Sequence, residues 1–156
     1  LRRALFGLAL RFEVPPHSAN RTGRASGRLI GGNLTVLCAA CGTPEEIYSE
    51  EPTILFIEEV NEHVYRVDRM LQQLLRSGGL SNVQAVVVGD FTRMAGTEQF
   101  GADSYGVIAD VLEPLDIPVL FGFPAGHDKL NMAIFLGRKA KLTVGKKGGI
   151  LEFSEE

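Results

Sequence analysis

The chain has 156 residues, 45% of them hydrophobic and 22% charged, which is typical of one soluble globular domain and excludes a disordered chain. Its net charge is -3 and the Lys and Arg residues are dispersed, so we expect no nucleic-acid partner. No apolar run approaches the roughly 20 residues of a membrane span, so we expect no membrane partner and a cytoplasmic location. Because the sequence begins with Leu1 rather than Met, we expect it to be a piece of a longer polypeptide.

The first part of the chain, residues 1–26, is predicted to be a connecting segment without regular secondary structure. The apolar opening over residues 1–11 is too short for a signal peptide and lacks a convincing cleavage site. Residues 13–28 are rich in Pro, Ser, Asn, Gly and Arg and have no apolar period, as in a connecting segment. We therefore expect residues 1–26 to be the connector from a missing N-terminal domain, followed by a domain over residues 27–156.

From residue 34 onwards, apolar periodicity predicts alternating helices and strands. Continuous apolar runs indicate strands that are covered on both faces, whereas spacing of three and four indicates amphipathic helices. In chain order we expect a helix over 34–41, an exposed loop over 45–53, a strand over 54–57, a helix from 64 to Gly78, a strand over 83–88, a polar insert over 90–103, a helix over 104–115 and strands over 119–121, 132–135, 140–144 and 149–153.

Polar residues and glycines mark the expected helix ends. Asn33 is the predicted N-cap of the first helix and Gly42 its C-terminal glycine, while Ser104 is the predicted N-cap of the helix that follows it. The preceding Gly31-Gly32-Asn33 suits either an anion-binding helix start or a tight packing turn. The mixture of elements predicts an α/β fold with a mixed sheet, flanking helices and a β-rich C-terminal end.

Two cysteines have the spacing of a redox pair. A reactive pair places its first cysteine at a helix start, where the helix dipole lowers the thiol pKa. Cys38 and Cys41 instead fall near the end of the predicted helix, at apolar positions. We expect them to be core thiols, and further ligands for a structural zinc are too few, so no metal or organic cofactor is expected.

A pair of glutamates closes the apolar strand over residues 54–57. Glu58 and Glu59 are adjacent, so on an extended strand their side chains point to opposite faces and only one can face a given site. Both could simply be solvated at the strand end. However, α/β folds present functional groups at the carboxyl ends of their strands, which makes Glu58 a candidate.

His127 is the histidine whose surroundings favour a function. It follows Pro124, Ala125 and Gly126, and the glycine lets the backbone bend tightly enough to bring an imidazole to a cleft. General-base catalysis needs such a ring, held in one tautomer by a carboxylate. Glu58 is the candidate for that orienting carboxylate, 69 residues before His127.

A nucleophile for this pair is not evident in the sequence. The Gly-x-Ser-x-Gly pattern does not occur, and the serines fall in segments that are predicted to be linker, loop, helix end or terminus. Phosphate-binding glycine motifs are also absent from the sequence. The residues thus predict the base-bearing half of a catalytic triad.

Four separated motifs, together with this pair, resemble one known family. The chain is similar, from Gly27 to about Thr143, to the C-terminal domain of the LD-carboxypeptidases, which include the muramoyltetrapeptide carboxypeptidases. The motifs are the sequence GRLIGGNL at residues 27–34, the tripeptide Gly42-Thr43-Pro44, the sequence ILFIEEVNEHVYRVDRML at residues 54–71 and the dipeptide Gly126-His127.

The resemblance implies a two-domain serine peptidase that removes the terminal D-alanine from murein tetrapeptides in the cytoplasm during peptidoglycan recycling. In that family the N-terminal domain carries the serine and the oxyanion-hole amides, and the C-terminal domain has a swivelling β/β/α fold. The positions of the family's Glu and His match Glu58 and His127, while Glu59 replaces a common aspartate. The expected partners are the murein tetrapeptide, the missing N-terminal domain and, as a further option, a second copy in a homodimer. Without the first domain, the chain is expected to be inactive.

Two alternatives remain open at the level of sequence. Relatives of the family hydrolyse microcin-type peptidyl-nucleotides, and aromatic stacking loops would distinguish them. The insert over residues 90–103 holds Phe91 and Phe100 and the chain has no Trp, which favours the peptidase. The other alternative is a binding or interface domain that has lost catalysis. The preference for lysine or diaminopimelate at the third peptide position is not set by this sequence.

Overall fold

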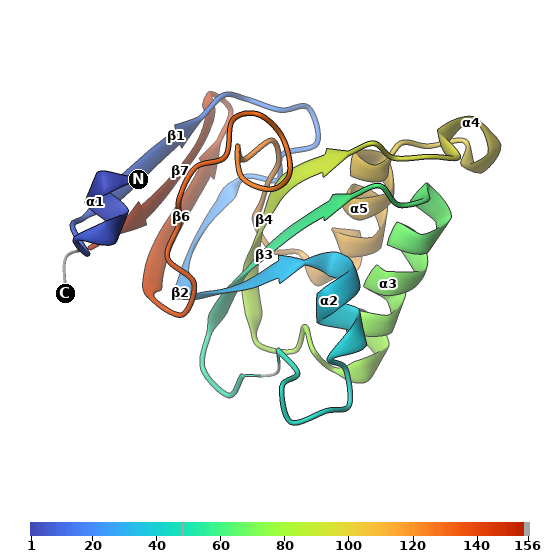
Figure 1. Ribbon diagram of the computed structural model, residues 1–156, viewed down its shortest axis with the longest axis horizontal. Coiled ribbons are helices and arrows are strands. Elements are labelled where there is room, and N and C mark those ends of the chain that lie inside the picture. Colours follow the sequence, from blue (N-terminus) through green and yellow to red (C-terminus); the bar gives the residue numbers. More distant parts are fainter. Residues whose placement is uncertain (48, 155–156) are drawn as a thin grey trace.

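The computed structural model describes residues 1–47 and 49–154. These residues form one seven-stranded mixed sheet with helices (Figure 1). The strand order is β1-β7-β6-β2-β3-β4-β5. The strands are β1 (Leu10–Val14), β2 (Gly23–Asn33), β3 (Thr53–Val60), β4 (Val83–Thr92), β5 (Val119–Leu120), β6 (Lys139–Gly145) and β7 (Gly148–Phe153). The helical elements are α1 (Arg2–Leu5), α2 (Leu34–Ala39), α3 (Val64–Ser77), α4 (Thr97–Phe100), α5 (Ser104–Leu112) and the 3-10 turn η1 (Glu113–Leu115).

The long strand β2 joins an antiparallel half of the sheet to a parallel half. Residues 23–28 pair with β6 in antiparallel fashion, and residues 28–33 pair with β3 in parallel. Gly31 lies in the parallel part with φ 131°, and a Cβ there would come within 1.9 Å of the Phe56 carbonyl oxygen. Gly31 therefore serves close backbone packing within β2, whereas a Cβ on Gly32 would meet nothing within 4 Å.

Helices cover one face of the parallel half. In Figure 1, α2, α3 and α5 lie together beside β3 and β4, on the side away from β1, β6 and β7. The apolar stripe of α3, residues Val64, Val67, Leu71 and Leu74, is fully buried against this face, as its spacing predicts. Gly78 ends the helix in the left-handed conformation. Among the described residues, no helix is long and apolar enough to cross a bilayer.

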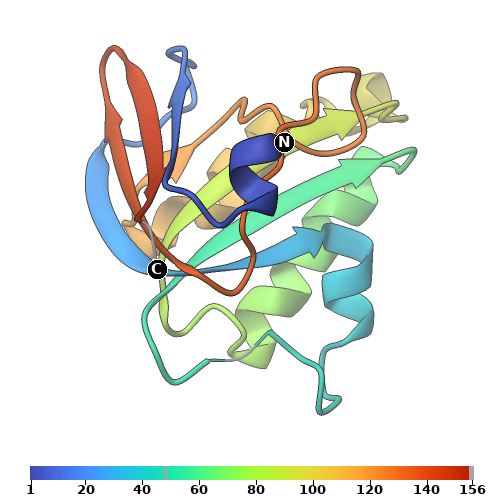
Figure 2. The same ribbon diagram turned by 60° about the vertical axis from the view of Figure 1, so that its left-hand side comes forward.

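The antiparallel half covers the other face of β3 and β4. Apolar residues of β1, β6 and β7 form one buried cluster with those of β3, β4 and β5. The Phe123 ring lies at its centre, with ring centroids 5.4 Å from Phe12 and 6.3 Å from Phe56, both edge to face. Figure 2 shows the sheet curling so that its antiparallel strands lie apart from the helices. The antiparallel half of the sheet, its parallel half and the helices thus form three layers. The predicted α/β fold with a mixed sheet and flanking helices is confirmed.

The predicted connector over residues 13–28 is wrong in its local structure. β1 pairs with β7 from Leu10↔Phe153 to Val14↔Gly149, and β2 begins at Gly23. In the first half of β2, Arg24 and Ser26 are exposed and alternate with glycine and alanine, so the apolar signal of a strand is weak. In β1, by contrast, Leu10, Phe12 and Val14 do show the alternation of a half-buried strand. The segment is part of the sheet, whereas its link to a further domain stays a prediction.

Two other local expectations are also wrong. Residues 132–135 form a loop rather than a strand, because their backbone is held by loop contacts such as Met132 N to Pro124 O at 2.8 Å. The N-cap of α5 is Asp103, whose side chain accepts from Gly106 N, and Ser104 is buried as the first helical residue. The predicted exposed loop over 45–53 spans Tyr48, which lies outside the described residues, and its last residue, Thr53, is buried in β3.

Candidate active site

Glu58 and His127 meet at the carboxyl end of the parallel strands. Glu58 is near the end of β3, and His127 lies in the loop that follows β5 and Phe121. The His127 Nδ1 atom is 2.7 Å from Glu58 Oε2, a hydrogen-bonding distance for an imidazole and a carboxylate. The structure therefore brings together two side chains that are 69 residues apart. Their catalytic role stays a prediction at this point.

The two partners differ sharply in burial. The Glu58 side chain is 7% exposed, whereas the His127 side chain is 52% exposed. A buried carboxylate with one fixed hydrogen bond holds the ring in place and favours the tautomer with its proton on Nδ1. About half of the His127 side chain remains accessible from outside. A buried carboxylate hydrogen-bonded to an exposed imidazole is compatible with the predicted pairing of a base and its orienting group.

A tight turn presents the histidine. Gly126 has φ 146°, and a Cβ there would lie 2.9 Å from Asp90 Cβ and 3.2 Å from Glu58 Oε2, so the position requires glycine. Asn131 closes the turn, since its Nδ2 donates to Gly126 O at 2.8 Å. The prediction that glycine lets the backbone bend here is confirmed, and the reason is the close approach of the turn to Asp90 of β4 and Glu58 of β3.

Asp90 is a residue of this site that sequence reasoning missed. It lies in β4 next to β3, and its backbone N donates to Ala125 O at 3.0 Å. Burial raises the pKa of its carboxyl, and the charges of Asp128 and Glu58 raise that pKa further. The available signal was the dipeptide Gly89-Asp90, an acidic residue after a buried apolar strand, the same pattern that singled out Glu58.

Glu59 points to the opposite face from Glu58, as expected for neighbours on a strand. It is buried rather than solvated and accepts four hydrogen bonds: from Asn33 Nδ2 at 2.8 Å, Val60 N at 2.9 Å, Thr35 N at 2.9 Å and Thr35 Oγ1 at 2.7 Å. Burial opposes the charge, but these bonds outweigh it and the pKa of Glu59 is lowered. Asn33 also caps α2 by accepting from Val36 N, as predicted. Glu59 thus fastens the start of α2 to β3.

Changing Glu59 to Gln should destabilise the chain in a pH-dependent manner. The lowered folded-state pKa means that the carboxylate stabilises the fold above its unfolded pKa, and that this contribution is lost as pH falls through the folded value. The amide turns one acceptor into a donor facing other donors, so we expect a loss of about 2 kcal/mol at pH 7. Urea unfolding at pH 7 and pH 4 measures it, with exposed Glu45→Gln as the control. A loss of equal size at both pH values would contradict the assignment.

The two cysteines are free thiols with structural surroundings. Cys38 is buried, Cys41 is half-buried, and Cys38 Sγ donates to Met70 O at 3.2 Å. Burial, followed by the neighbouring Cys41 and Glu59, raises the pKa of Cys38 to about 12. A thiol with this pKa is protonated near neutral pH, so the prediction of a core thiol rather than a redox pair is confirmed for Cys38. Within the described residues, His, Cys, Asp and Glu form no group of three suited to a metal ion.

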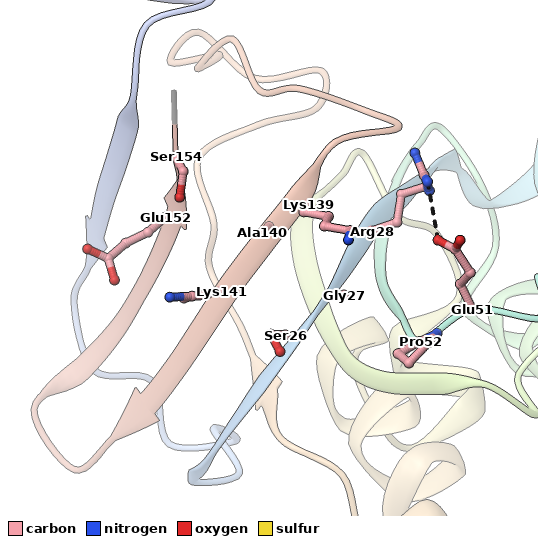
Figure 3. A pocket seen from close by; sticks show the side chains of 10 residues that line it. All are labelled: Ser26, Gly27, Arg28, Glu51, Pro52, Lys139, Ala140, Lys141, Glu152 and Ser154. Atoms are coloured by element: carbon pink, nitrogen blue, oxygen red, sulfur yellow. Dashed lines mark hydrogen bonds and ion pairs between the residues drawn. The ribbon is translucent and has the colours of Figure 1, made fainter. Parts of the chain in front are cut away.

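A surface hollow lies on the antiparallel half of the sheet, away from Glu58 and His127. Figure 3 shows it between β2, β6 and β7, with the Arg28–Glu51 ion pair at 3.2 Å on its rim. Its walls combine charged side chains with the apolar surface of residues such as Pro52 and Ala140, and neither Glu58 nor His127 lines it. A second hollow, lined by His63, Tyr65, Gly96, Gln99 and Phe100, lies near the carboxyl ends of β3 and β4.

Comparison with known proteins decides the family. The profile of the LD-carboxypeptidase C-terminal domain matches residues 26–142. The chain belongs to the LD-carboxypeptidase family. It is 34% identical over 141 residues to a probable murein peptide carboxypeptidase of Bacillus subtilis, a match that covers 90% of this chain and 44% of the relative. The resemblance expected from the four motifs is therefore confirmed.

Two further relatives help to define the domain. The muramoyltetrapeptide carboxypeptidase of Oxalobacter formigenes has a crystal structure that superimposes with a TM-score of 0.84 and 30% identity, over 99% of this chain and 53% of that one. The microcin C7 self-immunity protein of Escherichia coli is 30% identical over 131 residues, 81% of this chain and 36% of that protein. The chain thus spans about half, or less, of the length of these relatives.

Proposed function

We propose that this chain is the base-bearing domain of a serine L,D-carboxypeptidase that removes the terminal D-alanine from murein tetrapeptides in cytoplasmic peptidoglycan recycling. The single observation that carries the proposal is the His127–Glu58 pair, held at 2.7 Å with the carboxylate buried and the ring half exposed. The names of the murein peptidase relatives supply the substrate class. The second domain, which carries the serine, is the proposed partner.

The proposed reaction is acyl transfer to water. The serine Oγ of the N-terminal domain attacks the peptide carbonyl while His127 takes the serine proton at Nε2 and Glu58 stabilises the imidazolium. The C–N bond then breaks, and His127 gives the proton to the departing D-alanine amine. Water, deprotonated by the same ring, hydrolyses the acyl-enzyme and regenerates the serine. No metal or organic cofactor enters these steps.

Assays of the chain with and without an N-terminal domain test the proposal. Fused to that domain, the protein should release D-alanine from L,D-linked tetrapeptides, whereas the 156-residue chain alone should release none. The upstream coding sequence should contain a Gly-x-Ser-Asp-type turn. Substrates with lysine or diaminopimelate at the third position, compared by amino-acid analysis, set the side-chain preference. Turnover by the isolated chain would refute the division of the triad between two domains.

Hydrolysis of peptidyl-nucleotides is the second candidate, because a microcin self-immunity protein is 30% identical to this chain. Of the two phenylalanines that could stack on a base, Phe91 is buried against Tyr105, with ring centroids 6.1 Å apart. Phe100 is exposed and lines a hollow with Tyr65. An aminoacyl sulfamoyl adenosine offered to the two-domain protein distinguishes the candidates, since only the second predicts its cleavage.

A further inference from the structure

Asp90 contacts the turn that carries His127 at three successive points. On one side its backbone N donates to Ala125 O at 3.0 Å. In the middle, a Cβ on Gly126 would come within 2.9 Å of Asp90 Cβ and 3.2 Å of Asp90 Oδ2. On the far side, the backbone N–H of Asp128 lowers the pKa of the Asp90 carboxyl, against the stronger effect of burial. His127 lies between the second and third contacts.

The position of the Asp90 carboxylate is energetically unfavourable. Asp90 Oδ2 is buried and has no hydrogen-bond partner among the described residues. The same oxygen and Glu58 Oε2 each lie 3.2 Å from the point that a Gly126 Cβ would occupy, so two acidic groups flank one turn. Buried oxygens without partners and like charges at close range are both unfavourable. A residue kept for stability alone would avoid both, and their presence next to a catalytic pair points to a role in that site.

We infer that Asp90 is a positioning residue that holds the 125–128 turn, and with it the His127 ring, at the distance that Glu58 requires. The inference rests on the proposed role of His127 as the base. The Asp90 backbone hydrogen bond to Ala125 and the Asp90 side chain packed beside Gly126 restrain the turn from β4, and Asn131 restrains it from the loop side. The turn, and with it the imidazole, is thereby held in a fixed position against strand β4.

The groups that act on Asp90 come from every element packed around it. Asp128 and His127 belong to the turn, Glu58 belongs to β3, and Tyr105 of α5 donates its hydroxyl to Gly89 O at 3.3 Å. The Asp90 carboxyl is therefore surrounded by acidic groups and one imidazole. Changing it to Asn retains an acceptor for the Asp128 N–H while removing one of these like charges. Changing it to Ala removes the acceptor as well.

The test compares Asp90→Asn, Asp90→Ala and the exposed control Asp110→Ala. In the 156-residue chain, NMR should show a slowly exchanging Asp128 amide and a hydrogen-bonded His127 Nδ1 proton in the wild type, the control and Asp90→Asn. Asp90→Ala should lose both signals. In the two-domain enzyme, Asp90→Ala should lower kcat about 10- to 100-fold with little change in KM, and Asp90→Asn should recover most of that loss.

Because the NMR signals need no turnover, this inference and the proposed function can fail separately. If the Asp128 amide of Asp90→Ala exchanged at the wild-type rate and the signal of the His127 Nδ1 proton were unchanged, the positioning role would be overturned. If Asp90→Ala does not fold, Gly126→Ala tests the same contact from the turn side, since its Cβ would displace the turn from Asp90. Loss of the His127 Nδ1 proton in that variant supports the role, and its retention overturns it.

Discussion

Changing His127 to Ala in the two-domain enzyme should lower kcat for D-alanine release by about 10²- to 10⁴-fold. The imidazole is the proposed acceptor of the serine proton and the donor to the leaving amine, and no other titratable ring is hydrogen-bonded to Glu58 among the described residues. Binding contacts in the other domain remain, so KM should change far less than kcat. Steady-state assays of D-alanine release measure both constants.

The fold should survive this change. His127 is half exposed, and its hydrogen bond joins it to one residue, so the alanine variant should unfold within a few degrees of the wild type. His63→Gln, on the α3 side of the carboxyl edge, is the matched control and should keep its activity. If the His127→Ala enzyme retained most of its turnover, the residue could not be the general base.

Changing Glu58 to Gln should lower kcat by a similar factor, about 10²- to 10⁴-fold. The amide has the shape of the carboxylate but carries no charge, so it cannot stabilise the imidazolium that forms when the ring takes the serine proton. It can also offer an N–H to Nδ1, which favours the tautomer that has no free lone pair at Nε2. Pre-steady-state detection of the acyl-enzyme locates the loss in the chemical steps.

The neighbouring carboxylates provide internal comparisons for this change. Glu51→Gln, which removes an exposed partner of Arg28, should leave kcat unchanged. Glu59→Gln should act on stability, because the Glu59 carboxylate is hydrogen-bonded to the start of α2 and not to the imidazole. Equal kinetic losses in Glu58→Gln and Glu51→Gln would show that the loss does not depend on the His127–Glu58 contact.

Local patterns in the sequence predicted the parts of this fold that are stabilised by near neighbours. The apolar stripe of α3 repeats every three or four residues, and the N-cap Asn33 bonds to Val36, three positions away. The prediction failed at β1, although Leu10, Phe12 and Val14 alternate as in a half-buried strand, and at the first half of β2, where polar residues and glycines give no apolar period. These strands exist because β6 and β7, more than a hundred residues later, offer them partners.

The candidate site divides in the same manner. The sequence by itself determined the family, the two side chains Glu58 and His127, and the opposite directions of Glu58 and Glu59 on one strand, because motifs and strand alternation are local properties. Only the tertiary structure decided that Glu58 Oε2 and His127 Nδ1 lie 2.7 Å apart, that the carboxylate is buried while the ring is accessible, and that Asp90 contacts the turn between them. Such distances depend on how β3, β4 and the loop after β5 close on one another, and no spacing along the chain encodes that closure.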